Sequence, residues 1–303
     1  MTLQQLRYAV CVADKKSMNQ AASELFMSQP SLSAAIADLE EEIGIAIFNR
    51  SNRGVTVTTE GNEFLGYARQ LLEQYRLIDE RYIEKTEVKQ KFSVSMQHYT
   101  FAVKAFVELV KQFDMGKYEF AIHETKTFTV IENVRDFYSE LGILYRNDFN
   151  QKVLGKILSE NGLEFVELFE CKVYVYMWQG NPLAEKELLT MEDLEEYPCL
   201  SFEQGKNNSF YLAEEVLSTY QYKKIIKADD RATLLNMMRG VNAYTLCSGI
   251  VCEELNGNEY IAVPLDVKET MTIGYIKRAG LPLSKMAKMY ISELMKYRDS
   301  VMK

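Results

Sequence analysis

The amino-acid sequence predicts an α/β protein with an all-α N-terminal part. Three patterns support this fold class: helical spacing of apolar residues through the first sixty positions, a heptad pattern in the residues that follow, and alternation of strands with helices from Phe92 to the end. A chain of 303 residues is long enough for about two domains, and its hydrophobic fraction of 47% is ordinary for a globular protein.

The composition bears on location and partners. The net charge of −8 gives no overall sign of a nucleic-acid partner, and the N-terminus MTLQQLRYAV lacks the apolar core of a secretory signal. No apolar run approaches the length of a membrane span, so we expect a cytoplasmic protein with no membrane partner. The five cysteines are Cys11, Cys171, Cys199, Cys247 and Cys252. Their odd number favours reduced, mostly buried thiols. We expect no bound metal and no other cofactor.

The first segment predicts three short helices. Apolar residues at helical spacing, Leu3 to Ala13, form the first helix, and Ser17 with Gln20 forms a capping box for the second. Ser28 is expected to cap the third helix, which has Pro30 in its first turn and ends at Gly44. Its apolar stripe is Leu32, Ile36, Leu39 and Ile43. This order matches a helix-turn-helix, although the pattern alone equally allows a small helical bundle.

The next segment, IFNRSNRGVTVTTEG, predicts two short strands around a turn. Val55 and Val57 alternate with threonines, as in a half-buried strand. A hairpin directly after a helix-turn-helix is a wing, and Arg50 and Arg53 are placed to lie along a phosphate backbone.

A long helix with a narrow apolar seam is predicted after the wing, with Thr59 as its cap. The seam steps by four and three residues over about three heptads, which favours dimerisation; the alternative is packing on its own domain. The seam residues are Phe64, Ala68, Leu71, Tyr75, Ile78 and Tyr82.

The order of these parts resembles the LysR-type transcriptional regulators. The motifs A-A-x-x-L, S-Q-P-S-L-S, I-x-x-L-E, F-x-R and T-x-x-G all occur within residues 1–65. The resemblance implies a bacterial transcription factor, a homodimer or homotetramer, that binds promoter DNA and a small-molecule effector, with RNA polymerase as a further candidate partner. It implies a winged helix-turn-helix (1–58), a linker helix (59–88) and an effector-binding domain (92–303). That domain would hold two α/β subdomains like type 2 periplasmic-binding-protein domains, subdomain I at about 92–162 and 266–303 and subdomain II at about 163–265.

The predicted DNA-reading helix departs from many relatives, because Ala34 and Ala35 stand where those carry Arg or Lys. No basic residue lies between Lys16 and Arg50, and residues 1–60 hold five basic and seven acidic residues, a net of −2. The helix N-terminus, with its partial positive charge, is expected to help bind phosphate, and Gln29 is expected to pair with adenine. The remaining charge would come from Arg7, Lys15, Lys16 and the wing. The candidate DNA-binding residues are Ser28, Gln29, Pro30, Ser31, Ser33, Ala34, Arg50 and Arg53.

From Phe92 onward, strands alternate with helices. The predicted strands are KFSVSM, YEFAIHE, LGILY, CKVYVYMW, CLSFE, KKIIKADD, AYTLCS, EYIAVPL and MTIGYIKR, and a last helix begins near Ser284. This alternation predicts mostly parallel sheets. By resemblance, the chain crosses to the second subdomain near Gly162 and returns near Leu265.

Ligands of open α/β sheets bind beyond the carboxyl ends of strands, at helix N-termini. This rule selects Ser95, Gln97, His98, Tyr99, Thr100, Tyr145, Arg146, Ser201, Phe202, Glu203 and Thr245 as effector-binding candidates. Each has a structural alternative: His98 as a satisfied core histidine, Ser95 and Thr100 as ordinary caps, and Arg146 as a solvated arginine. Arg146 and the helix N-termini would favour an anionic effector.

Enzyme motifs are absent: the sequence has no G-x-G-x-x-G, P-loop, H-E-x-x-H or G-x-S-x-G. We therefore expect no enzyme. A redox-sensing regulator using Cys199 on the same scaffold is the alternative. A free-standing solute-binding protein or enzyme is a third, weaker one, because it would have no use for the N-terminal sixty residues.

Overall fold

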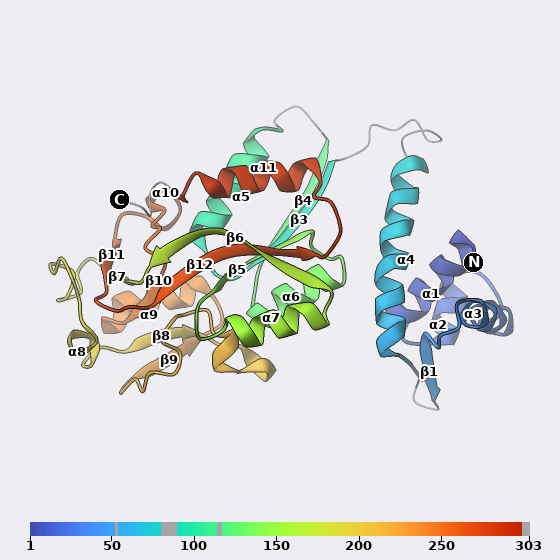
Figure 1. Cartoon of the computed structure of the whole chain (residues 1–303), viewed down its shortest axis with the longest axis horizontal. Coiled ribbons are helices and arrows are strands. Elements are labelled where there is room, and N and C mark those ends of the chain that lie inside the picture. Colours follow the sequence, from blue (N-terminus) through green and yellow to red (C-terminus); the bar gives the residue numbers. More distant parts are fainter. Residues whose placement is uncertain (52–53, 80–89, 114–116, 299–303) are drawn as a thin grey trace. The chain divides into compact units, whose positions relative to one another are not determined.

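The computed structural model describes residues 1–51, 54–79, 90–113 and 117–298 (Figure 1). The chain divides into two compact units, Met1–Val88 and Lys89–Lys303. None of the helices in these described ranges is long and apolar enough to cross a membrane.

The N-terminal unit contains the predicted three helices, a hairpin and a long helix. The elements are α1 (Leu3–Lys15), α2 (Met18–Glu24), α3 (Gln29–Ile43), β1 (Phe48–Ser51), β2 (Gly54–Val57) and α4 (Thr59–Ile78). A capping side chain begins both α2 and α3. The Ser17 side chain accepts a hydrogen bond from Gln20 N, and Ser28 Oγ accepts one from Ser31 N at 3.2 Å. Gly44 ends α3 in the left-handed conformation, φ 71°.

The α3 stripe forms the centre of this unit's core. Leu32, Ile36 and Leu39 are fully buried, and they pack in one cluster with α1, α2 and the hairpin. Glu40 is structural, because its Oε1 accepts hydrogen bonds from the backbone N–H groups of Ile47 and Phe48 at the start of the wing. One of the three consecutive glutamates in α3 is therefore part of the fold.

The cap of α4 is Thr58, one residue before the predicted Thr59. Thr58 Oγ1 accepts from Gly61 N at 2.8 Å and donates to Ala46 O. Gly61 lies so close to the wing that a Cβ there would collide with the Ile47 carbonyl oxygen. The T-x-x-G motif thus joins the wing to α4, because the threonine caps the helix and the glycine permits the close approach.

The predicted seam of α4 divides into two parts. Ala68 is buried within its own unit, so it is not available for the expected dimer seam. Phe64 is half-buried and packs in part on the same unit's core. Leu71 and Ile78 are 47% and 56% exposed. Tyr75 is half-buried beneath the guanidinium of Arg7. Tyr82 and the predicted continuation of the helix to 88 lie outside the described residues.

The second unit contains two five-stranded sheets. The first has the strand order β4-β3-β5-β12-β6, and its helices are α5 (Thr100–Lys111), α6 (Thr127–Arg135), α7 (Gln151–Glu160) and α11 (Lys285–Met295). Its strands are β3 (Gln90–Met96), β4 (Tyr118–Glu124), β5 (Leu141–Arg146), β6 (Leu163–Lys172) and β12 (Thr270–Arg278). We call this sheet and its helices subdomain I.

Subdomain II is built on the second sheet, with the order β11-β7-β10-β8-β9. Its strands are β7 (Tyr174–Trp178), β8 (Cys199–Phe202), β9 (Ile225–Ala228), β10 (Tyr244–Cys247) and β11 (Tyr260–Pro264). The helices are α8 (Met191–Leu194), α9 (Arg231–Val241) and α10 (Glu253–Asn256), with 3₁₀ turns at Gly205–Asn207 and Phe210–Leu212.

The sheets differ from prediction in direction and in the crossing point. Both are mixed, because β12 runs antiparallel to β5 and β6, and β7 runs antiparallel to β10 and β11. The segment CKVYVYMW is not one strand: β6 ends at Lys172 in the first sheet and β7 begins at Tyr174 in the second. The chain therefore crosses at Val173, later than the expected Gly162, since β6 pairs with β12. It returns between Pro264 and Thr270.

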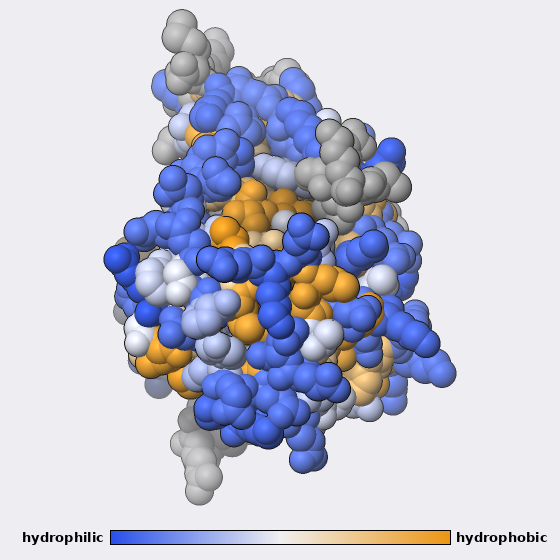
Figure 2. Space-filling model, turned by 90° about the vertical axis from the view of Figure 1, so that its left-hand side faces the viewer, coloured by the Kyte–Doolittle hydropathy of each residue, from blue (hydrophilic) through white to orange (hydrophobic). Residues whose placement is uncertain are grey.

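The outer face of subdomain II is mainly hydrophilic. Figure 2 views the chain from the side on which α8, β8 and β9 lie in Figure 1, and hydrophobic residues there form separate patches between hydrophilic ones. Scattered exposed apolar residues of this kind are normal on soluble proteins. The candidate ligand site is instead a cavity at the boundary of the two subdomains.

Candidate functional site

A cavity of about 80 Å³ lies where the two subdomains meet. Subdomain I contributes the residues that follow β3 and open α5, and subdomain II contributes the ends of β8 and β10 and the start of α9. Its lining from subdomain I is His98, Tyr99, Thr100, Phe101 and Met271. From subdomain II it is Tyr176, Phe202, Glu214, Glu215, Arg231, Leu234, Leu235, Thr245, Leu246, Cys247, Ser248, Ile250, Val251 and Asn256.

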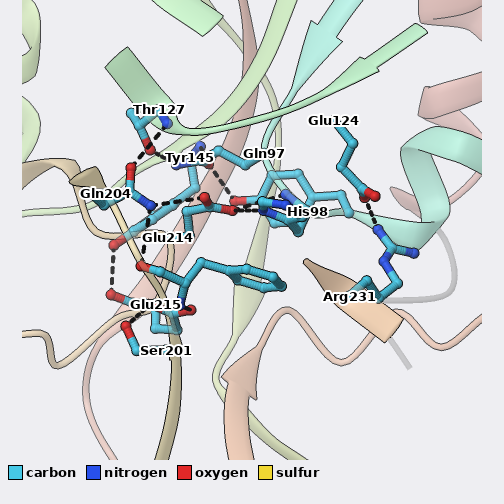
Figure 3. A network of polar contacts seen from close by, with 12 residues as sticks. Gln97, His98, Glu124, Thr127, Tyr145, Ser201, Gln204, Glu214, Glu215 and Arg231 are labelled. Carbon is cyan, nitrogen blue, oxygen red and sulfur yellow. Dashed lines mark hydrogen bonds and ion pairs between the residues drawn. The ribbon is translucent and has the colours of Figure 1, made fainter. Parts of the chain in front are cut away.

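His98 connects the two subdomains at one wall of this cavity. Its Nδ1 lies 2.8 Å from Oε2 of Glu214, and its backbone N–H donates to the same oxygen at 2.9 Å. The His98 ring also stacks on Phe202, with the centroids 3.7 Å apart and the planes within 4°. Both side chains of the His98–Glu214 pair are nearly inaccessible to solvent, at 6% and 4%. This contact is therefore a buried bridge (Figure 3).

A chain of amides and hydroxyls extends this bridge. Gln204 Nε2 donates to Glu214 Oε1 at 2.9 Å, and Thr127 N donates to Gln204 Oε1 at 3.1 Å. Gln97 Nε2 donates to Thr127 Oγ1, while its Oε1 accepts from Tyr99 OH and Tyr145 N. Each buried amide thus has partners in its own or the facing subdomain, as buried polar groups require (Figure 3).

Glu215 is a buried acid beside this network. Its Oε1 accepts from Phe202 N at 2.9 Å, its Oε2 lies 3.0 Å from Ser201 Oγ, and its backbone oxygen accepts from Tyr145 OH. Burial, and secondarily the charge of Glu214, raises the pKa of Glu215 to about 8. Near neutral pH the side chain is therefore mainly protonated.

Arg231 forms a second bridge at the cavity mouth. It is the first residue of α9, and its guanidinium donates across the boundary to Thr100 Oγ1 and to Glu124. Asn256 Nδ2 also donates to Thr100 Oγ1, and to Tyr176 OH, both at 3.1 Å. Thr100 thus accepts two hydrogen bonds from subdomain II. Nearby Phe101, Leu234, Ile250 and Met271 supply apolar lining.

Five of the predicted effector residues line the cavity: His98, Tyr99, Thr100, Phe202 and Thr245. The other six, Ser95, Gln97, Tyr145, Arg146, Ser201 and Glu203, lie outside its lining. Ser95 is buried against Ser139 and Asn133, and Arg146 pairs with Glu167 and stacks on Phe165. Glu203 accepts from Gly205 N and pairs with Lys227.

Two residues that the strand-end rule did not select lie across the cavity from Thr100. Ser201 lines a neighbouring pocket, while Arg231 and Tyr176 face the cavity opposite Thr100. The strand-end rule could have found Arg231, because it opens the helix after β9. The rule could not have found Glu214 or Glu215, since they follow a 3₁₀ turn and no periodic pattern marks them.

Most of the residues predicted to contact DNA are exposed. Ser28, Gln29, Pro30, Ser31 and Ala34 are exposed at the start of α3, and Ser33 is half-buried. Two basic side chains that were expected to supply charge for DNA binding contact residues of their own unit. Lys15 pairs with Glu24, and Arg7 lies over the Tyr75 ring. The Arg50 side chain and all of Arg53 lie outside the described residues.

The five cysteines are separate thiols in the part of the chain that the structure describes. All five are free thiols, and no cluster of metal-ligating side chains occurs there. Cys199 is 3% exposed, and burial raises its pKa to about 12. A thiol with so high a pKa has a negligible thiolate fraction at neutral pH, which argues against the redox-sensing alternative.

Known families match both units. Residues 3–62 match the family described as "Bacterial regulatory helix-turn-helix protein, lysR family", and residues 97–297 match "LysR substrate binding domain". The second match alone covers more than half of the chain. The chain therefore belongs to the LysR family of transcriptional regulators.

Similar proteins cover nearly the whole chain. A probable RuBisCO transcriptional regulator of Phaeodactylum tricornutum is 25% identical over 316 residues, covering 99% of this chain and 98% of the relative. The DNA-binding transcriptional dual regulator OxyR of Escherichia coli is 22% identical over 291 residues, covering 93% and 91%. The solved structure of full-length OxyR from Pseudomonas aeruginosa has a TM-score of 0.62 at 19% identity, covering 97% and 94%. That last likeness shows a shared fold.

Proposed function

We propose that this chain is a sequence-specific regulator that binds double-stranded promoter DNA and responds to a small molecule held between its two subdomains. The cavity carries this proposal, because residues of both subdomains line it and two bridges, His98–Glu214 and Arg231–Thr100, cross the boundary there. A ligand touching both sides favours one closure of the subdomains, and it shifts DNA binding by its differential affinity for the two closures.

The polar lining favours a ligand with hydrogen-bond acceptors on an apolar body. Thr100 Oγ1 accepts from Arg231 and Asn256, and Tyr176 OH accepts from Asn256. The hydroxyl hydrogens of Thr100 and Tyr176 are thus left to donate, beside the Arg231 guanidinium. A carboxylate or carbonyl group suits such donors, and the apolar lining suits a hydrocarbon portion.

Thr100→Val tests the cavity as the effector site. The variant keeps the side-chain shape and removes the hydroxyl, so a bound ligand would lose a partner worth about 1–3 kcal/mol. We expect the effector response to shift to higher concentration, measured as DNA affinity titrated against a metabolite found by a thermal-shift screen. Thr100→Ser retains the hydroxyl and should stay close to the wild type. Coincident titrations of Thr100→Val and wild type would remove Thr100 from the site.

Gln29→Ala tests the DNA surface. One bidentate base contact is worth about 1–3 kcal/mol, so the variant should bind its selected site more weakly and lose preference at one A·T pair. Binding to duplexes that vary at each position measures this preference. Gln20→Ala, on the preceding helix and also exposed, is the control and should leave base preference unchanged. If Gln29→Ala kept the full preference, the groove assignment would be wrong.

The exposed residues of α4 support assembly as a homodimer or homotetramer. Leu71 and Ile78 are seven residues apart on one face, a heptad spacing, and both are about half exposed. Pairing of such faces would bring two DNA-binding units together and raise their joint affinity, which suits a unit of low positive charge. Leu71→Glu with Ile78→Glu should reduce the mass measured by light scattering; an unchanged mass would refute the seam. A cytoplasmic location and contact with RNA polymerase belong to the same proposal.

A further inference from the structure

Two helices of this chain end in the same unusual way. After α2, Leu25 is the C-cap and Phe26 adopts a left-handed conformation, φ 53°; after α6, Asp136 is the C-cap and Phe137 does the same, φ 60°. The backbone N–H of Phe26 donates to Ser23 O, and that of Phe137 donates to Val134 O. Both phenylalanines therefore occupy the position at which glycine usually ends a helix.

A bulky residue is disfavoured at this position, because its Cβ crowds the backbone when φ is positive. At Phe137 the side chain offsets this strain. The ring is half-buried, and the Arg278 guanidinium lies 4.6 Å from its centroid. This phenylalanine is explained by packing within its own unit.

Phe26 has no such explanation, because its side chain is 97% exposed. Isolated exposed apolar residues are common, but they rarely occupy a strained backbone position that glycine or asparagine would fill with less strain. The backbone of Phe26 is thus strained, and its exposed ring makes no packing contact in the unit that would offset this strain.

Phe26 lies two residues before Ser28, which caps α3. It is therefore close along the chain to Gln29 and Pro30, which are also exposed and lie at the start of that helix. The ring has no donor or acceptor for a phosphate. Within a major groove, the apolar group that suits phenylalanine is the C5-methyl of thymine.

We propose that Phe26 contacts DNA, its ring packing on a thymine methyl beside the base pair that the start of α3 reads. This inference rests on the proposed DNA-binding function. It also suits the low charge of the unit, since residues 1–60 carry five basic and seven acidic residues. An apolar contact adds affinity and base preference without neutralising phosphates, so its contribution is independent of salt.

The test uses the full-length chain and a duplex that it selects from a random-sequence pool. Phe26→Gly and Phe26→Asn relieve the backbone strain, so their thermal midpoints should equal or exceed that of the wild type. We expect about a three- to tenfold loss of affinity for the selected duplex, the scale of one or two buried methylene-sized groups, with an unchanged salt slope. Phe137→Gly is the matched control, and its DNA affinity should match the wild type.

Replacing each thymine of the duplex by deoxyuridine identifies the contact, because only the methyl group is removed. One such replacement should weaken wild-type binding about three- to tenfold and leave Phe26→Gly unaffected. Wild-type affinity in both Phe26 variants, or loss of affinity with no deoxyuridine effect in the wild type, overturns the inference while leaving DNA binding intact. If the wild type selects no sequence at all, the proposed function fails together with the inference.

Discussion

The two units of this chain differ in how far apart in the sequence their stabilising contacts lie. In the N-terminal unit, helices begin with hydrogen bonds between residues three apart, as at Ser28–Ser31 and Thr58–Gly61. In the second unit, the bridges between subdomains join residues 116 apart, His98 and Glu214, and 131 apart, Arg231 and Thr100. Local contacts act within one helix, whereas the distant ones need both subdomains in their folded positions.

This difference bears on regulation. A helix cap stabilises one element and is unaffected by how other elements move. The His98–Glu214 and Arg231–Thr100 bridges instead depend on the relative position of two subdomains, so a ligand between the subdomains acts on them directly. Substitutions in the two kinds of contact should therefore differ in how much unfolding free energy they remove and in which unit they destabilise.

The largest effect is expected from Glu214→Ala. It removes the acceptor for His98 N–H, the His98 ring and Gln204, leaving buried donors unpaired. Each buried donor left without an acceptor costs about 1–3 kcal/mol. Denaturant unfolding followed by the fluorescence of Trp178, the single tryptophan and a residue of β7, measures it.

The control for this substitution is Glu254→Ala. Glu254 pairs with Lys104 across the same boundary but its side chain is 67% exposed, so its loss should destabilise the chain far less than the loss of Glu214. Equal losses for the two variants would show that burial does not set the strength of these bridges, and would break the comparison between the units.

The next effect concerns pH. The pKa of Glu215 rises from an ordinary 4.5 to about 8 in the folded chain, so the folded state holds a proton that the unfolded state has released. Its contribution to stability is full below about pH 4.5 and is lost as pH rises towards 8, with a slope of up to about 1.4 kcal/mol per unit. Glu215→Gln stays neutral and should flatten the Trp178 unfolding profile over this window.

Glu254→Gln provides a control for the pH profile. Lys104 lowers the pKa of Glu254, so this side chain releases its proton at a lower pH than Glu215 does. Its replacement should leave the slope between pH 4.5 and 8 unchanged. A wild-type profile without a falling slope there would contradict the protonated state of Glu215.

The smallest effect is expected from Thr58→Ala in the N-terminal unit. The variant removes a local cap from Gly61 N, which typically costs about 1 kcal/mol and up to about 2. Calorimetry should show the loss in the transition of the N-terminal unit, while the Trp178 signal of the second unit stays at the wild-type midpoint. A shift of both transitions would mean that the units are energetically coupled and that local contacts are not confined in their effect.

The sequence alone determined most of the N-terminal unit. Ser28, Pro30 and Gly44 mark the ends of α3, and the stripe through Leu32 and Ile36 marks its buried face. Caps and helical periodicity act over three or four residues, so they can be read from a short stretch of chain. The same local rules located the strands of the second unit, apart from β6, and placed His98 and Thr100 near a strand end.

Only the tertiary structure decided how the strands of the second unit pair and which residues meet at its cavity. It placed β6 beside β12 and moved the crossing to Val173, because strand pairing depends on partners far along the chain. It buried Ala68 against its own unit while leaving Leu71 exposed, although both fit the same heptad pattern. It brought Glu214 to His98 and Arg231 to Thr100, and it made Glu215 a protonated acid. Periodicity cannot encode these contacts, since burial and charge environment at a residue are set by whatever the folded chain brings next to it.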